Sequence, residues 1–273
     1  MSQGWNTTAP TSEDDVLGTL LDLQGSCWLS RGHARCHGAL VPSIDRKACD
    51  GLLRTEKLQC ERRSIDQFRS AARFFSSAGE QQSLVDDFIA LMVLRHHGVP
   101  TRLLDWSASP YVAAYFAVME HDDQDGELWT FSRPDYETKG KAQWRRWPRT
   151  TTDGSGDADK FAAALTAFSV DDPPDWIIAA FYPAGFPRQN AQCGAYTIMA
   201  RFGIDHADAL RALLADPSRY HRYVIKANLK SVLRTTLREN HGIWQGSLFP
   251  DTAGAAETAR GAFPRNDKLC NGV

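Results

Sequence analysis

Eight polar side chains lie within fourteen residues in the middle of the chain, in a connector between two apolar segments. They are His96, His97, Thr101, Arg102, Asp105, Trp106, Ser107 and Ser109. A connector that only reversed the chain would need a glycine, a proline and a helix cap, whereas binding residues concentrate on loops held by rigid elements. The cluster therefore predicts a site. Singly, its members leave a structural role open: an Arg102–Asp105 ion pair, or a helix cap at Ser109.

Arg31 is a second residue whose type and position suit chemistry. Residues 27–29 predict a short buried strand that delivers Arg31 and Gly32 at its exit. An arginine there either pairs with a carboxylate or holds a phosphate or ribose with its planar fork. The glycine would let a ligand come close. The residues alone leave both roles of the arginine open.

Gln192 lies in a later polar link that also carries Arg188. It precedes Gly194 and an apolar strand, so alternation would place its side chain on the same face as Gly194. We expect the missing side chain of that glycine to open space for a ligand. The alternative is a hydrogen bond from Gln192 to a neighbouring loop.

Two helices are predicted to hold the central polar connector. The first has its apolar face at helical spacing and ends at Gly98, before Pro100. That face is formed by Val85, Phe88, Ile89, Met92 and Val93. Residues 101–106 then form a short extended run. Ser109 supplies an N-cap hydroxyl and Pro110 occupies the first helical position of the second helix, where no amide hydrogen is needed.

The other segments predict helices and strands that do not alternate regularly, which favours an α+β fold over a doubly wound sheet. We expect helices over 12–24, 61–75 and from 229 onward, and strands over 127–132, 175–182, 194–199 and 220–227. Residues 133–159 are poor in aliphatic side chains and predict a surface excursion or lid. In it, Trp144 and Trp147 either stack on a base or adenine ring, or fold back onto the core.

Composition indicates an ordinary globular protein. The 273 residues suit one compact domain, with 42% hydrophobic and 23% charged residues and a formal charge of -2, so nothing draws the chain globally to nucleic acid or membrane. A local basic groove stays open, although pairs such as Arg62–Arg63 are more often a solvated face. No run approaches the eighteen apolar residues of a membrane helix.

Cysteine usage points to a reducing compartment. The six cysteines form no CxxC pair, and the N-terminus shows no basic-then-apolar signal peptide, so we expect reduced thiols and a cytoplasmic location. Cys27, His33, Cys36 and His37 lack the spacing of a zinc site, and no metal is expected.

The central run resembles a known signature. His-His-Gly-Val-Pro-Thr-Arg-Leu-Leu-Asp-Trp-Ser-Ala-Ser-Pro at 96–110, followed by Ala-Ala-Tyr-Phe-Ala at 113–117, is similar to the FRG domain family, named for a Phe-Arg-Gly motif. Trp-Leu-Ser-Arg-Gly-His at 28–33 matches that name, with Leu-Ser where the family has Phe before Arg. Weaker resemblances at 187–197 and 246–251 extend over most of the chain in the family's order, with Tyr196 at what is usually a Phe.

The resemblance implies a single FRG-type domain over 1–273. Its expected core is a mixed, strongly twisted sheet of ADP-ribosyltransferase type with flanking helices, and NAD is its substrate. In that superfamily an early-strand Arg or His holds NAD, a Ser-Thr-Ser-like element props the nicotinamide half, and a late-strand acid drives transfer. These three roles fall to Arg31, to Ser107 with Ser109, and to Gln192. The other residues expected to bind NAD are Gly32, His33, His97, Thr101, Arg102 and Arg188.

Gln192 departs from the acid of that pattern, because a neutral amide orients a ribose hydroxyl but offers no charge to a developing oxocarbenium cation. Losing one such partner costs on the order of a hundredfold in rate. Either Asp105 or Glu61 supplies the charge, or the domain binds a nucleotide without turning it over.

The resemblance thus implies transfer of ADP-ribose from NAD to a macromolecular acceptor, nucleic acid or protein, in a toxin or phage-defence setting. A neutralising or regulatory partner protein would accompany such an effector, and no membrane partner is expected. The alternatives are a non-catalytic module that recognises a nucleotide, nucleic acid or protein segment, and an NADase without an acceptor.

Overall fold

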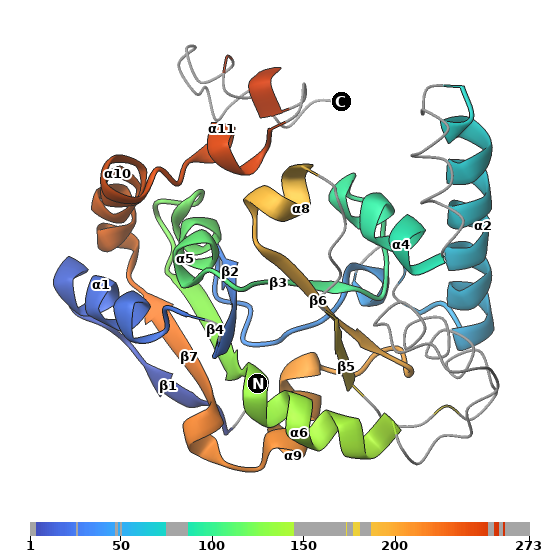
Figure 1. Ribbon diagram of the computed structural model, residues 1–273, viewed down its shortest axis with the longest axis horizontal. Coiled ribbons are helices and arrows are strands. Elements are labelled where there is room, and N and C mark those ends of the chain that lie inside the picture. Colours follow the sequence, from blue (N-terminus) through green and yellow to red (C-terminus); the bar gives the residue numbers. More distant parts are fainter. Residues whose placement is uncertain are drawn as a thin grey trace.

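The described part of the protein is built on one mixed sheet. The computed structural model describes residues 4–25, 27–46, 49, 51–74, 87–144, 173, 177–180, 187–250, 254–256 and 259. Its strands are β1 (Asn6–Thr8), β2 (Trp28–His33), β3 (Leu104–Ser107), β4 (Gly126–Ser132), β5 (Ile177–Ala180), β6 (Gly194–Met199) and β7 (Tyr220–Ile225). They lie in the order β1-β7-β4-β2-β3-β6-β5 (Figure 1). The β1–β7 pair is parallel and the other neighbours are antiparallel, which confirms the α+β class.

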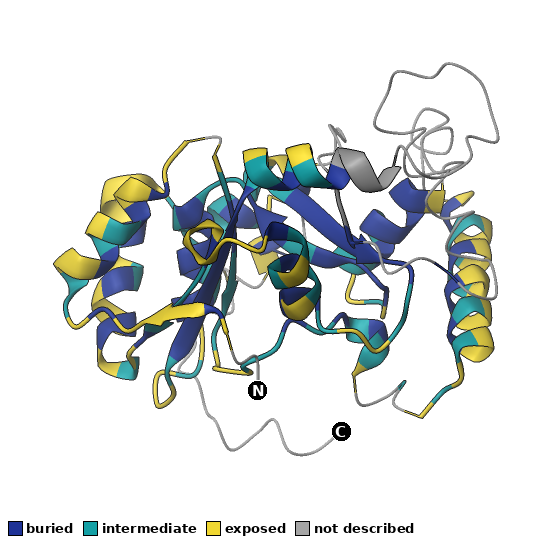
Figure 2. Cartoon of the chain, turned by 90° about the horizontal axis from the view of Figure 1, so that it is seen from below, coloured by how far each residue is buried: buried dark blue, intermediate teal, exposed yellow. Residues whose placement is uncertain are grey.

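Helices flank this sheet (Figure 1). The α-helices are α1 (Glu13–Asp22), α2 (Arg54–Ala72), α4 (Asp87–His96), α5 (Pro110–Val118), α6 (Arg133–Trp144), α8 (Pro187–Ala191), α9 (His206–Leu214), α10 (Lys230–His241) and α11 (Gln245–Leu248). Short 3-10 turns are η1 (Ser43–Asp45), η3 (Pro217–Arg219) and η4 (Ala227–Leu229). The central strands and the inner helix faces are largely buried while the outer helix faces and the edge strand β1 are exposed (Figure 2).

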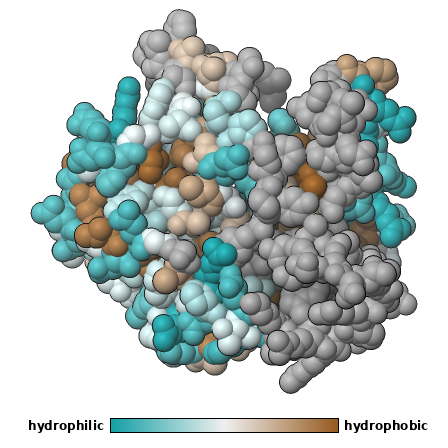
Figure 3. Space-filling view, viewed as in Figure 1, coloured by the Kyte–Doolittle hydropathy of each residue, from teal (hydrophilic) through white to brown (hydrophobic). Residues whose placement is uncertain are grey.

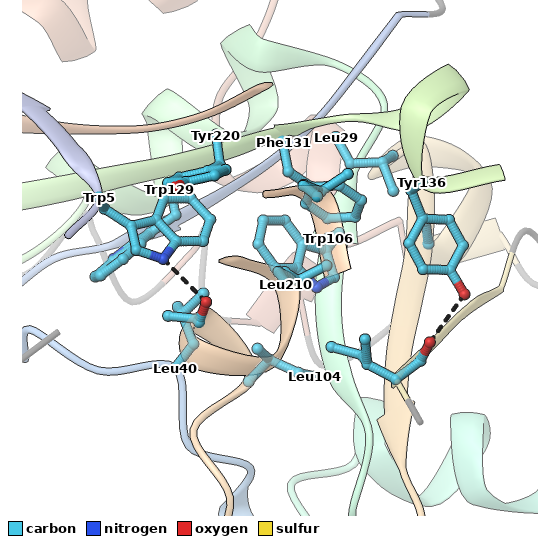
Figure 4. Packing of buried hydrophobic residues seen from close by; sticks show 14 of the residues in the cluster. Trp5, Leu29, Leu40, Leu104, Trp106, Trp129, Phe131, Tyr136, Leu210 and Tyr220 are labelled. Carbon is cyan, nitrogen blue, oxygen red and sulfur yellow. Dashed lines mark hydrogen bonds between the residues drawn. The ribbon is translucent and has the colours of Figure 1, made fainter. Parts of the chain in front are cut away.

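One face of the sheet packs against α6 and α9. Aromatic side chains from four elements interlock there, with Trp106 edge-on to Phe131 and Trp5 edge-on to Trp129 (Figure 4). The Trp5 indole donates to the carbonyl of Ala207 at 3.0 Å, as Figure 4 shows, and the Trp106 indole donates to the Thr197 hydroxyl at 2.9 Å. The buried indole nitrogen of Trp129 has no hydrogen-bond partner among the described residues. Edge-to-face aromatic pairs of this kind stabilise the core beyond the area that they bury.

The opposite face is divided between two helix groups. Helices α1, α5 and α10 pack over β4 and β7, whereas α2 and α4 pack over Tyr196 and Ile198 of β6. Gly32 lets α5 approach β2, because a Cβ there would stand 1.9 Å from the carbonyl oxygen of Ala113. The predicted ligand approach at Gly32 is therefore wrong: helix backbone fills that space.

The helices around the connector begin and end as expected. Gly98 follows α4 with φ of +79°, and the Ser109 side chain accepts from the Val112 amide at the start of α5, where Pro110 is the first residue. Val85 lies outside the described residues. Strand β2, however, continues to His33, so Arg31 and Gly32 lie within the strand and not at its exit.

The segment predicted as a surface excursion begins with regular structure. Residues 133–144 form α6, which buries Tyr136 in the core, where its hydroxyl donates to the Ile177 carbonyl at 3.1 Å. Residues 145–159, the Trp144 side chain and Trp147 lie outside the described part, so the lid and the ring stacking stay predictions.

The surface shows hydrophilic residues over much of one face, with hydrophobic ones in small groups (Figure 3). The large hydrophobic residues that are exposed come from separate segments: Leu21, Leu53, Phe74, Ile204 and Val232. Scattered apolar side chains of this kind are normal. None of the helices in the described ranges combines the length and the apolar character that a membrane span requires.

Candidate functional site

Arg31 joins two strands where their main-chain pairing ends. Strands β2 and β3 pair at one position, Ser30 with Ser107. Two residues along β3, Arg31 Nη1 donates to the main-chain carbonyl of Asp105 at 2.5 Å and lies 3.4 Å from its carboxylate Oδ2. The guanidinium takes the place of a ladder hydrogen bond. Arg31 is mostly buried, whereas the Asp105 side chain is 36% exposed and accessible to a ligand.

Arg95 of α4 holds the same carboxylate from the other side. Its Nε and Nη2 both lie 2.8 Å from Asp105 Oδ2, and its Nη1 donates to the Ser43 hydroxyl at 3.3 Å. Both arginines thus engage Oδ2. No described residue donates a hydrogen bond to the second oxygen, Oδ1, so one carboxylate oxygen is left for another partner.

Positive charge exceeds negative charge around Asp105. Burial would raise the pKa of Asp105, but Arg95 and Arg31 outweigh it and the pKa is lowered, so the carboxylate is ionised. Burial lowers the pKa of Arg31 to about 10, with Asp105 opposing the shift. Burial lowers the pKa of Arg46, whose guanidinium also interacts electrostatically with Arg95 and Asp105. Three guanidinium groups around one carboxylate suit an anionic ligand.

His33 links Arg31 to the carboxylate of Glu127. Arg31 Nε donates to His33 Nε2 at 2.8 Å, and His33 Nδ1 lies 3.0 Å from Glu127 Oε1. Glu127 is fully buried in β4, opposite His33 in the register. Burial and then Arg31 lower the pKa of His33 to about 4, so the ring is neutral at pH 7.

The hydroxyl groups of Ser107 and Ser109 form hydrogen bonds with main-chain groups. Ser107 Oγ donates to the Gln192 carbonyl at 2.7 Å and accepts from the Ser109 amide at 3.0 Å, while Ser109 caps α5. Gln192 donates through Nε2 to the Leu248 carbonyl of α11 at 3.1 Å, so it makes a structural hydrogen bond, with a short helix in place of the loop that the sequence suggested. The space expected at Gly194 is absent, because Gln189 Cγ would stand 2.9 Å from a Cβ there.

Arg102 is directed into the core. Its Nε lies 3.0 and 2.8 Å from the carboxylate oxygens of Glu61, and its guanidinium lies over the Phe202 ring at 4.6 Å. The Arg102–Asp105 pair considered from the sequence is therefore wrong. Glu61 is equally buried, so its carboxylate is committed to Arg102 and does not reach the Asp105 cluster.

The other predicted residues are dispersed around this cluster. His97 is exposed after the end of α4, and Thr101 is buried with its amide donating to the Ser43 hydroxyl at 3.1 Å. Arg188 Nη1 donates to the His96 carbonyl at 2.7 Å, and its guanidinium lies 4.8 Å from the Phe249 ring centre. The predicted residues thus meet in two groups. Arg31, His33 and Asp105 form a network through their side chains, whereas Ser107, Ser109 and Gln192 are joined through main-chain groups.

The sequence did not single out Arg46, Arg95, Glu127 or Arg222, and two of these are instructive. Arg95 stands just before the conspicuous His-His pair, in the last turn of an apolar helix. Glu127 begins an otherwise apolar strand segment, Glu-Leu-Trp-Thr-Phe. A carboxylate in such a strand needs a charged or hydrogen-bonding partner when buried, and that requirement could have singled it out.

Among the described residues, no group of three or more His, Cys, Asp or Glu side chains is placed to hold a metal ion.

Comparison with known proteins gives one match. A family model described as the FRG domain matches residues 26–126. Neither the curated proteins nor the solved structures include a match. The matched range contains β2, β3, α4 and α5, and therefore Arg31, Arg95 and Asp105. Residues 26–126 are therefore similar to the FRG domain family.

Proposed function

We propose that the Arg31–Asp105–Arg95 cluster binds NAD and that the protein transfers ADP-ribose to a macromolecular acceptor, nucleic acid or protein. The observation that carries this proposal is an ionised, partly exposed carboxylate beside an excess of guanidinium groups, with one oxygen that no described residue engages. The resemblance to ADP-ribosyltransferases supports NAD, because an arginine on an early strand and a Ser-x-Ser at a helix start follow that order.

The arginines suit the pyrophosphate of NAD. Arg31, Arg95 and Arg46 bring three positive charges to one negative charge, and a pyrophosphate diester carries two negative charges. Guanidinium forks recognise phosphate oxygens in a fixed plane. Partial burial strengthens such contacts relative to those in water.

Asp105 suits the reacting ribose. Transfer breaks the bond between the nicotinamide nitrogen and ribose C1′, whose electron pair leaves with neutral nicotinamide. The acceptor then forms a bond to C1′ and releases its proton. Positive charge develops on the ribose in between, and an ionised carboxylate nearby stabilises it. Gln192 carries no charge and is tied to the Leu248 carbonyl, so we assign this role to Asp105.

The cellular setting belongs to the same proposal. An ADP-ribosyltransferase-type sheet, action as a toxin or phage-defence effector, and a neutralising or regulatory partner follow from the family resemblance. A cytoplasmic location is proposed from the cysteine usage and the N-terminal sequence.

A second candidate function is nucleotide recognition without turnover. Asp105 Oδ2 is already engaged by Arg95 and Arg31, and the position of the family's acid is held by a hydrogen-bonded glutamine. Both features favour a site that binds a nucleotide over one that turns it over, because neither leaves an acidic group free of protein contacts.

One experiment separates these functions. NAD is titrated calorimetrically into the full chain, and NAD labelled in the adenylate half is incubated with the chain and cell extract. Binding heat with label on a macromolecule supports the transferase. Binding heat with intact NAD supports the recognition module, and free labelled ADP-ribose alone supports an NADase. A folded chain that shows neither heat nor turnover overturns the NAD proposal.

A further inference from the structure

Arg31 is held by a polar chain that crosses three strands. Glu127 of β4 lies directly opposite His33 of β2, and Arg31 lies two residues before His33 on the same face. Arg222 of β7 continues the chain, with Nε and Nη2 at 2.9 and 2.8 Å from Glu127 Oε2. These side chains are mostly or fully buried, with His33 12% and Glu127 0% exposed.

The direction of each hydrogen bond follows from the chemistry of the groups. Arginine only donates, so His33 Nε2 must accept from Arg31 Nε. A neutral imidazole then carries its proton on Nδ1, which donates to Glu127. In the other tautomer the Nε2 proton of His33 would point at the Nε–H of Arg31, so two donors would face each other. The unprotonated Nδ1 would then face the Glu127 carboxylate, and neither group could donate. The buried carboxylate thereby selects the tautomer.

Further hydrogen bonds hold the Glu127 carboxylate in its orientation. Its Oε1 also accepts from the His37 amide at 3.0 Å, and its Oε2 accepts from Arg222 and from the Gly38 amide at 3.4 Å. With both oxygens engaged, the carboxylate is fixed. It fixes the His33 ring, which in turn fixes the plane of the guanidinium.

The fixed guanidinium presents a free edge. Arg31 Nε is bound to His33 and Nη1 to the Asp105 carbonyl, whereas Nη2 has no hydrogen-bond partner among the described residues. We propose that Glu127 acts through His33 as a positioning pair that orders Arg31 before a phosphate-bearing ligand arrives. The ligand part of this inference rests on the proposed function. Because such order lowers the entropy lost on binding, it should raise affinity.

Two substitutions at His33 separate positioning from simple packing. His33→Gln places an amide group near the Nε2 position and keeps an acceptor for Arg31, but it loses the donor to Glu127. His33→Asn places its amide near the Nδ1 position, keeping the donor to Glu127 and losing the acceptor. The control is His37→Gln, which removes the ring that lies edge-on to His33 at 5.3 Å but keeps the main-chain amide that donates to Glu127.

The first measurement needs no ligand. Nitrogen NMR at pH 7 should show His33 protonated on Nδ1 alone. The Arg31 Nε–H signal should exchange slowly in the parent, His33→Gln and His37→Gln proteins and rapidly in His33→Asn. A His33 protonated on Nε2, or an Arg31 signal equally mobile in the parent and in His33→Asn, overturns the positioning pair.

The second measurement concerns affinity, with NAD and inorganic pyrophosphate as probes. We expect about tenfold weaker binding in His33→Asn and at most about threefold in His33→Gln, corresponding to loss of one hydrogen bond that orders the arginine. Stability should follow the opposite order, because His33→Gln deprives buried Glu127 of a donor. If affinity and stability fall in the same order, His33 is only structural. A parent protein with the expected NMR signals that binds neither probe overturns the proposed function and the ligand part, while the ordering of Arg31 stands.

Discussion

Arg102 and Glu61, 41 residues apart in sequence, form an ion pair with only 4% and 7% of their side chains exposed. Removing one partner of such a pair leaves an uncompensated buried charge. We therefore expect Glu61→Ala to lower the free energy of unfolding by about 3–5 kcal/mol, measured by urea denaturation.

The double variant Glu61→Ala with Arg102→Met provides the control, because an apolar chain near Phe202 removes the unpaired charge. It should recover part of the lost stability. The pair is structural if NAD binding by the folded Glu61→Ala protein matches the parent. A stable Glu61→Ala protein that has lost NAD binding would instead make Glu61 a site residue.

Gly32 should tolerate no side chain. A Cβ would stand 1.9 Å from the Ala113 carbonyl oxygen and 2.6 Å from the Ala117 nitrogen, so α5 would have to leave β2. We expect Gly32→Ala to cost at least about 3 kcal/mol, as overpacking against backbone does. Gly18→Ala is the control: the helix α1 leaves open space there, and alanine should add about 0.5–1 kcal/mol. Thermal unfolding of both variants tests the contrast, and an unchanged Gly32→Ala midpoint would contradict it.

Local signals were readable from the sequence, and long-range partners were not. The start of α5 follows from Ser109 and Pro110, which act within one helical turn. Arg31 and Asp105, by contrast, are 74 residues apart and meet because β2 and β3 are neighbours in the sheet. The sequence offered Arg102 as a nearer partner for Asp105. In an extended run, however, residues three apart point to opposite sides.

The glycines show the same limit. Gly32 and Gly194 suggested room for a ligand. A glycine in the sequence, however, indicates only that a side chain does not fit at that position, and not which group occupies the space. Helix α5 excludes it at Gly32 and Gln189 excludes it at Gly194. Which group takes the space depends on packing between distant segments. Periodicity could therefore predict most elements and the α+β class, but not which candidate residues share a site.

Two buried histidines should make the protein sensitive to acid. Burial is the main reason that the pKa of His33 falls to about 4 and that of His206 to about 3, against 6.5 ordinarily. The unfolded chain gains these protons first as pH falls. Stability is thus fully present above pH 6.5 and declines as pH drops toward 4, by about 3 kcal/mol for His33 alone.

Urea unfolding at pH 8, 6, 5 and 4 measures this decline. His33→Gln should be less stable than the parent at pH 8 but lose less stability on acidification. A second decline is expected as pH falls from 4.5 to about 2, where Glu127 takes up its proton. Equal midpoints at pH 8 and pH 5 would contradict the assignment of neutral buried histidines.

Gln192→Ala should affect the attachment of α11 and not the reaction. Its Nε2 hydrogen bond to the Leu248 carbonyl is one ordinary contact, so we expect a loss of about 1 kcal/mol in stability. NAD affinity and transfer rate should stay near those of the parent in the paired calorimetric and labelled-NAD assays. A sharply slower transfer with unchanged affinity would restore Gln192 to the catalytic role that the family resemblance implied.

Asp105→Asn tests whether the carboxylate takes part in chemistry. The amide keeps the shape and an oxygen for Arg95, but removing the negative charge increases the positive charge that faces a pyrophosphate. NAD affinity should therefore be kept or slightly raised. Transfer should slow by about a hundredfold or more, because the charge that stabilises the oxocarbenium-like ribose is lost. Calorimetry with NAD and single-turnover label transfer measure the two quantities separately.

The alternative role for Asp105 predicts a different result. If its carboxylate only holds Arg31 and Arg95 in place, the loss of charge loosens both arginines, and affinity falls together with transfer rate. Asp208→Asn is the matched control, since Asp208 pairs with Arg211 on an exposed helix face and should change neither quantity. A rate loss confined to Asp105→Asn at unchanged affinity identifies an interaction made mainly in the transition state. Unchanged rate and affinity would remove Asp105 from the reaction and leave a site that binds without catalysis.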